Sequence, residues 1–141
     1  MNADKAFFDT NVLLYMYSSA DRHKQAMAQE LFEACASSGR ILLSTQVVQE
    51  FYVAGARKFA LPRRELREAT VAFLELPLVK ISPSHILLAL EIEQRHQVSF
   101  WDALILAAAE SGGAGVLYTE DLNDGQTYGS VQVQNPFRIS A

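Results

Sequence analysis

Short apolar runs alternate with longer segments of helical periodicity along most of the chain. Apolar runs predict buried strands at residues 6–8, 41–43, 78–81 and 115–119, and an alternating segment predicts a fifth strand at 131–133. Helical spacing, capping residues and stops at Pro or Gly predict the intervening helices. We expect these helices to begin near residue 12 and then to span about 20–36, 45–59, 62–75, 83–95 and 100–111.

Strands that alternate with helices predict an α/β fold. Its central sheet would be mostly parallel, with four or five short strands and helices on both faces. A chain of 141 residues suits one domain, which we expect to span residues 1–141. In sheets of this kind, functional sites form at the carboxyl ends of the strands. Side chains that carry chemistry are therefore expected along this edge.

The composition is ordinary for a globular protein, with 50% hydrophobic and 20% charged residues. The lone cysteine, Cys35, permits no intrachain disulfide, which is typical of a reducing compartment. The sequence has neither the pattern of a secretory signal nor an apolar run of the roughly 20 residues that a membrane span requires. We therefore expect a cytoplasmic protein without a membrane partner.

The net charge of −4 argues against nucleic acid as a partner, but the charges are unevenly distributed. Five of the 12 basic residues fall between positions 57 and 67. They form either a solvated surface or a grip on RNA phosphates. The acids gather elsewhere, and a carboxylate site that holds a metal ion would not repel phosphate. The basic cluster consists of Arg57, Lys58, Arg63, Arg64 and Arg67.

Four acidic residues stand where a parallel sheet would gather them. Asp9 follows the first predicted strand directly, and Asp121 follows the fourth by two residues. Glu50 lies about two turns into the helix after the second strand. Asp102 lies in the first turn of the helix that Ser99 is expected to cap. Taken alone, each acid has an ordinary explanation as a cap, a turn residue or an exposed helix residue. Their shared location instead predicts one acidic site.

Carboxylates that converge in this way repel one another and raise one another's pKa values. A divalent cation removes that penalty. Oxygen ligands suit Mg²⁺ or Mn²⁺, and Mg²⁺ typically uses few carboxylates together with water and substrate phosphate. The pattern therefore predicts a metal site at the strand ends.

The motifs around these acids resemble those of the PIN-domain ribonucleases, and among them most closely the VapC-type toxins of bacterial toxin–antitoxin pairs. The resemblance rests on DTNVLLY near the start, QVVQEFY around Glu50, SFWDALI around Asp102, and TED after VLY. It covers essentially the whole chain, with the motifs in family order. No single motif would be specific enough to identify the family.

The resemblance implies an endoribonuclease that hydrolyses RNA phosphodiester bonds with Mg²⁺ or Mn²⁺, as the toxin of a type II toxin–antitoxin pair. Its partners would be RNA, a cognate antitoxin protein and a second copy of the chain in a homodimer. By this resemblance, the catalytic, metal-binding acids are Asp9, Glu50, Asp102 and Asp121. The supporting residues are Asn11, Ser99 and Thr119.

The last motif departs from the family pattern, in which a second acid follows sooner. Here the order is Asp121-Leu122-Asn123-Asp124. Either Asp121 or Asp124 completes the site, and Asp121 is favoured because it lies nearer the strand end. Trp101, beside Asp102, is expected to pack in the core rather than to stack on bases.

Two other functions compete with the ribonuclease. An aspartyl-nucleophile phosphatase usually has a second Asp two residues after the nucleophile, where this chain has Asn11. It also needs a lysine near the later acids, and none lies between Arg95 and Arg138. A non-catalytic binding module on the same fold would be expected to have lost some of the acids, yet all four positions are filled.

Overall fold

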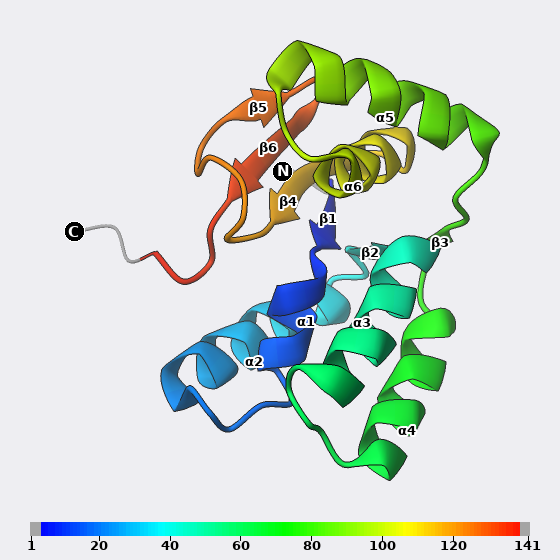
Figure 1. Cartoon of the computed structure of the whole chain (residues 1–141). Coiled ribbons are helices and arrows are strands. Elements are labelled where there is room, and N and C mark those ends of the chain that lie inside the picture. The colour runs from blue at the N-terminus through cyan, green and yellow to red at the C-terminus, as the bar shows by residue number, and fades with distance from the viewer. Residues whose placement is uncertain (1–3, 139–141) are drawn as a thin grey trace.

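The computed structural model describes residues 4–138, in which strands and helices alternate as the sequence predicts (Figure 1). The strands are β1 (Lys5–Phe8), β2 (Ile41–Ser44), β3 (Leu78–Val79), β4 (Ala114–Tyr118), β5 (Thr127–Tyr128) and β6 (Val131–Gln134). The helices are α1 (Thr10–Tyr15), α2 (Arg22–Ser37), α3 (Thr45–Arg57), α4 (Arg63–Leu74), α5 (Pro83–His96) and α6 (Phe100–Ser111). The predicted domain, residues 1–141, extends beyond the described residues at both ends, so its limits stay a prediction.

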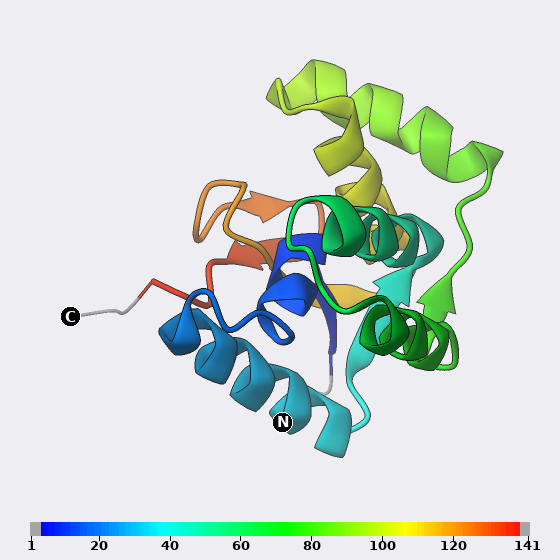
Figure 2. The ribbon, with the colours of Figure 1, turned by 60° about the horizontal axis from the view of Figure 1, so that its bottom comes forward.

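The strands form one sheet in the order β3-β2-β1-β4-β6-β5. Every neighbouring pair is parallel except β5 and β6, which are antiparallel. Figure 2 shows α2 along one face of the sheet, and α6 with α5 along the other. These features confirm the predicted α/β fold with a mostly parallel central sheet.

The central strand β1 is short, yet its last three residues are fully buried. Both faces of a parallel sheet are covered by helices, so its strands are apolar at every position rather than at alternate ones. On one face, the ring of Phe8 meets Phe32 of α2 at 5.2 Å between centroids, and it also meets Tyr118 of β4 at 5.3 Å. The buried run AFF thus brings the chain to the carboxyl edge at Asp9.

Helix α6 is covered on two sides, because it packs between the sheet and α5. Residues 103–109 are all buried, and the alanines among them allow the close approach of both neighbours. This double burial fixes the first turn of α6, which carries Asp102. Within residues 4–138, no helix combines the length and apolar character that crossing a membrane requires.

The sheet has six strands, one more than the upper limit of the prediction. Strand β5 is only two residues long and is joined to β6 by a two-residue turn at Gly129-Ser130, where Gly129 has φ +60°. Two residues are too few to show any periodicity. Strand β3 is likewise shorter than predicted, because the Ile81 N–H bonds to the Thr45 hydroxyl (3.1 Å) after the strand has ended.

Candidate functional site

Buried polar side chains gather at the carboxyl ends of β1, β2 and β4. They are Asp9, Thr10, Ser44, Gln46 and Thr119. A pocket of about 510 Å³ opens at this edge. Its lining includes all four acids that the sequence places at strand ends, Asp9, Glu50, Asp102 and Asp121. The fold thus brings together side chains from four separate segments of the chain.

Asp9 is the most deeply placed of the acids, with 5% of its surface exposed. Its backbone N–H continues the β1–β4 pairing by donating to the Tyr118 carbonyl (3.0 Å). One carboxylate oxygen accepts the Thr10 N–H (2.7 Å), which caps α1, and the other accepts the Thr119 hydroxyl (2.6 Å). The side chain is therefore held from two neighbouring strands at once.

Glu50 lies on the inner side of α3 and has two partners that sequence reasoning missed. The Thr10 hydroxyl donates to Glu50 Oε1 (3.0 Å), and the Gln46 amide donates to Glu50 Oε2 (3.3 Å). The same amide group donates to the Trp101 carbonyl (3.1 Å). Gln46 could have been suspected because it stands four residues before Glu50, on the same face of the helix.

Asp102 and Asp121 complete the pocket wall from α6 and from the loop after β4. The Ser99 hydroxyl accepts the Asp102 N–H (3.1 Å), so Ser99 caps the helix that carries this acid. The Asp121 N–H donates to the Thr119 hydroxyl oxygen (3.1 Å). Thr119 therefore connects the backbone of Asp121 with the carboxylate of Asp9.

The electrostatics of the pocket are those of an acidic site without a counter-charge. The pKa of Asp9 is raised to about 7, and burial is the largest cause. The charges of Asp121 and Asp102 also raise it, while its two hydrogen bonds lower it. Burial also raises the pKa of Asp102, helped by Asp121 and Glu50. Among residues 4–138, no ion pair involves any of these four acids. A cation in the pocket would remove this repulsion.

The remaining predicted residues divide between the pocket and the surface around it. Asn11 and Arg57 line the pocket. Asp124 does not. It accepts the Asn135 N–H (2.8 Å) and lies 3.7 Å from Arg138. Of the two acids that could complete the site, Asp121 is therefore the one at the pocket. The other members of the basic cluster are exposed outside it, at Lys58, Arg63, Arg64 and Arg67.

The prediction that Trp101 packs in the core is wrong. Its side chain is 61% exposed and lines the pocket beside Asp102. The buried stretch of α6 begins only at Ala103, two residues later. The preceding turn faces the opening rather than the sheet.

The residues at this edge fit a divalent ion that is held partly by water. Within the described range 4–138, no three His, Cys, Asp or Glu side chains are arranged tightly enough to hold a metal ion by themselves. Mg²⁺ does not require such a cage, because it commonly binds one or two carboxylates and keeps several waters. A buried aspartate with a raised pKa and no cationic partner is a suitable ligand.

The family model for PIN domains matches residues 6–124, which includes all four acids of the pocket. The chain belongs to the PIN domain family. This confirms the family predicted from the four motifs. Among curated protein sequences, no relative matches.

Solved structures with this fold include several toxins. A toxin–antitoxin complex from Klebsiella pneumoniae matches with a TM-score of 0.71 and 22% identity, over 96% of this chain and 100% of that chain. VapC20 of Mycobacterium tuberculosis, a toxin that cleaves the sarcin–ricin loop, matches with a TM-score of 0.68 and 20% identity, over 83% and 90%. DNA-bound VapBC from Salmonella typhimurium matches with a TM-score of 0.68 and 17% identity, over 94% and 98%. At these identities the likeness establishes the PIN fold.

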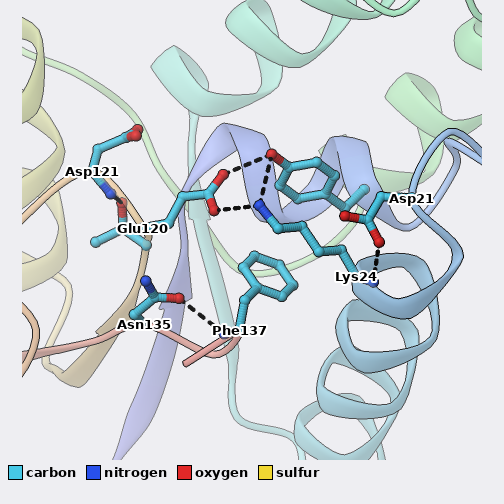
Figure 3. Close-up of polar contacts among 8 residues, drawn as sticks. Asp21, Lys24, Glu120, Asp121, Asn135 and Phe137 are labelled. Atoms are coloured by element: carbon cyan, nitrogen blue, oxygen red, sulfur yellow. Dashed lines mark hydrogen bonds and ion pairs between the residues drawn. The ribbon is translucent and has the colours of Figure 1, made fainter. Parts of the chain in front are cut away.

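Beside the pocket of this PIN domain, a polar clasp anchors the loop that carries Asp121 (Figure 3). We use the term clasp for Tyr15, Lys24 and Glu120. The Lys24 ammonium lies 2.8 Å from Glu120, and the Tyr15 hydroxyl donates to the same carboxylate (2.7 Å). Lys24 also lies over the rings of Tyr15 (4.7 Å) and Phe137 (5.2 Å). In Figure 3, Glu120 turns toward Lys24 while Asp121 turns away from it. The clasp thus joins α1 and α2 to the loop after β4, and Lys24 also contacts the segment at Phe137.

Replacing Lys24 by methionine should loosen this loop. The change keeps the length of the side chain but leaves Glu120 without its cation, so we expect a loss of about 1 kcal/mol in the free energy of unfolding. Urea denaturation measures the loss, and hydrogen exchange should rise at the amides of residues 119–122. Arg64→Met is the matched control, because the Arg64–Glu68 pair is highly exposed and contributes little. Equal effects of the two substitutions would contradict a role for the clasp.

The raised pKa of Asp9 predicts a pH-dependent stability in the presence of a chelator. A folded-state pKa of about 7, against 3.8 when unfolded, means that the folded state binds more protons between these values. The contribution of Asp9 to the free energy of unfolding is therefore greatest below pH 4, and it is lost as the pH rises toward 7. Between pH 5 and pH 8, we expect the wild type to lose about 3 kcal/mol of stability relative to Asp9→Asn, since about two units of the pKa shift lie in this range and one unit corresponds to ~1.4 kcal/mol.

Urea denaturation of both proteins at pH 5 and pH 8 measures this difference. Mg²⁺ should stabilise the wild type at pH 8 far more than it stabilises Asp9→Asn, because binding to the folded state alone raises the free energy of unfolding. If the difference between the two proteins were the same at both pH values, the buried carboxylate would not carry the effect.

Proposed function

We propose that this PIN domain is a Mg²⁺- or Mn²⁺-dependent endoribonuclease that hydrolyses RNA phosphodiester bonds in the cytoplasm, as the toxin of a type II toxin–antitoxin pair. The proposal is carried by one observation. Asp9, Glu50, Asp102 and Asp121 line a single pocket at the carboxyl edge of a PIN fold, with no basic partner in any ion pair of the described residues. A cation bound in such a pocket would relieve the repulsion among the carboxylates, and it would attract phosphate.

The four acids would divide the work according to their surroundings. Asp9 is fixed by two hydrogen bonds and Glu50 by two more, so both are set in place before any ligand binds. Asp102 is only partly buried, and Asp121 is exposed at the pocket mouth. Asp9 and Glu50, which these hydrogen bonds fix, would therefore serve as metal ligands, while Asp102 and Asp121 would face the incoming water and phosphate.

A bound Mg²⁺ or Mn²⁺ supplies a water of lowered pKa and neutralises charge that develops on the phosphate. The chain's own groups hold the acids in the orientation that this chemistry needs. The Thr119 hydroxyl donates to Asp9, which favours the ionised form of that carboxylate and fixes its orientation. Gln46 and Thr10 fix the orientation of Glu50 through their own hydrogen bonds. Asn11, which lines the same pocket, can donate to a phosphate oxygen or to a water.

The basic cluster would supply the electrostatic grip on the RNA backbone. Arg57 is the member that lines the pocket together with the acids. The other four side chains extend the positive surface along α3 and α4. Phosphate contacts of this kind position RNA without reading its sequence.

A protein partner is proposed by analogy with the structural neighbours, which include a toxin–antitoxin complex and a DNA-bound VapBC assembly. An antitoxin segment would cover the acidic pocket or the basic surface, and an arginine reaching among the carboxylates would inhibit the enzyme. A homodimer is proposed on the same analogy. Apolar side chains exposed on α5 support it, at Ile86, Leu87 and Leu90.

Asp9→Asn and Asp102→Asn should abolish RNA cleavage while the fold is retained. Both changes keep the shape of the side chain and remove its charge. Loss of an outer-shell partner of a metal costs about 10- to 100-fold in activity, so loss of a direct ligand should cost more than roughly 100-fold. The measurement is cleavage of structured RNA with Mg²⁺ or Mn²⁺, against a chelator control, with circular dichroism to verify folding.

Asp124 provides the matched control for Asp121. Asp121→Asn should reduce cleavage strongly, whereas Asp124→Asn should leave it nearly unchanged, because Asp124 lies outside the pocket and its remaining oxygen can still accept the Asn135 N–H. Cleavage that persists with a chelator, or in Asp9→Asn at the wild-type rate, would refute the metal-dependent ribonuclease. Turnover of a phosphate monoester without cleavage of RNA would favour the phosphatase instead.

Arg57→Gln should weaken RNA binding and flatten its salt dependence. Removing one phosphate contact lowers the slope of log K against log salt by about 0.7 to 0.9. Arg22→Gln is the control, because Arg22 is exposed at the start of α2, outside the pocket and the basic cluster. Binding of a labelled RNA at several salt concentrations measures both variants. Identical slopes for Arg57→Gln and the wild type would count against a phosphate contact at this residue.

A further inference from the structure

The pocket contains a large exposed aromatic side chain that neither the core nor a metal site requires. Trp101 is 61% exposed, on the first turn of α6, immediately before Asp102. Its ring meets that of Phe100 edge to face, with 5.2 Å between centroids, and its side chain lines the pocket. An exposed tryptophan at a site mouth is a common means of binding a ligand.

The wall beside Trp101 is also apolar. Val53, which is 50% exposed, lines the pocket together with Ala54 and Ile105. A metal ion and a phosphate need oxygen ligands and positive charge, and neither needs this surface. The pocket therefore has two parts. The acids form one part, and Trp101 with the apolar wall forms the other. Arg57 also lines the pocket.

We propose that Trp101 is the stacking platform of a nucleobase subsite, so that the pocket takes an unpaired nucleotide of RNA. This inference rests on the proposed ribonuclease function and deepens it. A nucleotide offers a flat aromatic base beside an anionic phosphate. The pocket offers a flat ring with apolar neighbours, together with Arg57 and an acidic site that calls for a cation. The two patterns of charge and apolar surface are complementary.

The platform is tied to the acids through Gln46. The Gln46 amide donates both to the carbonyl of Trp101 and to the carboxylate of Glu50, and Gln46 is itself buried. The start of α6 is therefore fixed relative to α3. A base stacked on Trp101 would hold its nucleotide at a set place relative to the acids, which is the positioning that phosphodiester cleavage needs.

The proposal restricts the substrate to nucleotides whose bases are accessible. In a duplex, each base is stacked on both faces and its ring is not available to a protein side chain. The subsite would accept loops, bulges and single strands, and it would favour purines for their larger stacking surface. Stacking of this kind tolerates different sequences, because every base has a π-face.

The chain has one tryptophan, so its fluorescence reports directly on this subsite. The protein to use is the wild type with Ca²⁺ in place of Mg²⁺, since Ca²⁺ also takes oxygen ligands, and a gel verifies that the RNA stays intact. The probe is single-stranded oligoadenylate of roughly 12 nucleotides, within the range of site sizes for such proteins. We expect quenching by this RNA. We expect none from an abasic ribose-phosphate oligomer of equal length and charge, or from the same oligoadenylate paired with oligouridylate.

The second experiment measures the cleavage kinetics of single Trp101 variants in which the four acids are intact. For a cleaved RNA, Trp101→Ala should raise KM about 5- to 150-fold, the range for loss of one stacked base, with a smaller effect on kcat. Trp101→Phe should restore most of the affinity because it keeps an aromatic ring. Val71→Ala is the matched control, since Val71 is a similarly exposed apolar side chain on α4, outside the pocket. It should leave KM unchanged.

Several outcomes would overturn the proposal. They are absence of quenching at the highest oligoadenylate concentration, equal quenching by the abasic oligomer, or an unchanged KM in Trp101→Ala. If Trp101→Ala instead lost self-association or an antitoxin contact while RNA binding stayed intact, Trp101 would belong to a protein interface. Failure of the ribonuclease function is separate, because it would appear as absence of RNA cleavage by the wild type with Mg²⁺ or Mn²⁺, whatever the fluorescence with Ca²⁺ shows.

Discussion

The arrangement of this site depends on a buried carboxylate that has hydrogen bonds but no counter-charge. Asp9 ends the central strand, caps α1 and accepts the Thr119 hydroxyl from the neighbouring strand. These bonds fix the carboxylate and lower its pKa, yet burial outweighs them and raises the pKa to about 7. The metal-free fold therefore carries an electrostatic penalty at the point where three strands end. A cation is the simplest group that removes it.

The position of this carboxylate was predictable because it follows from local rules. An apolar run that ends in Asp-Thr-Asn indicates a buried strand with a capping residue after it, and parallel strands end at a common edge. The same reasoning locates Asp102, since Ser99 marks the start of its helix. Long-range convergence of acids at 9, 50, 102 and 121 thus follows from the order of strands and helices, without knowledge of any side-chain contact.

Features that depend on side-chain direction could not be predicted in this way. Trp101 stands one residue before Asp102, but the turn of the helix directs it to the pocket opening rather than the core. Gln46 has no motif of its own, although it connects Glu50 with α6. The clasp joins Tyr15, Lys24 and Glu120 across about a hundred positions of the chain, and its members are common surface residue types. Only tertiary packing reveals their partners.

The acidic net charge and the proposed RNA substrate are compatible only if metal and RNA bind interdependently. Without a cation, the four acids of the pocket outnumber Arg57, which lines it with them, and they repel an RNA phosphate. With a cation bound, the same acids become ligands and the pocket presents positive charge to the backbone. RNA in turn supplies phosphate oxygens that Mg²⁺ prefers over a further carboxylate. By thermodynamic linkage, each ligand should therefore strengthen the binding of the other. Such linkage is how a chain with a net charge of −4 would bind the proposed RNA substrate.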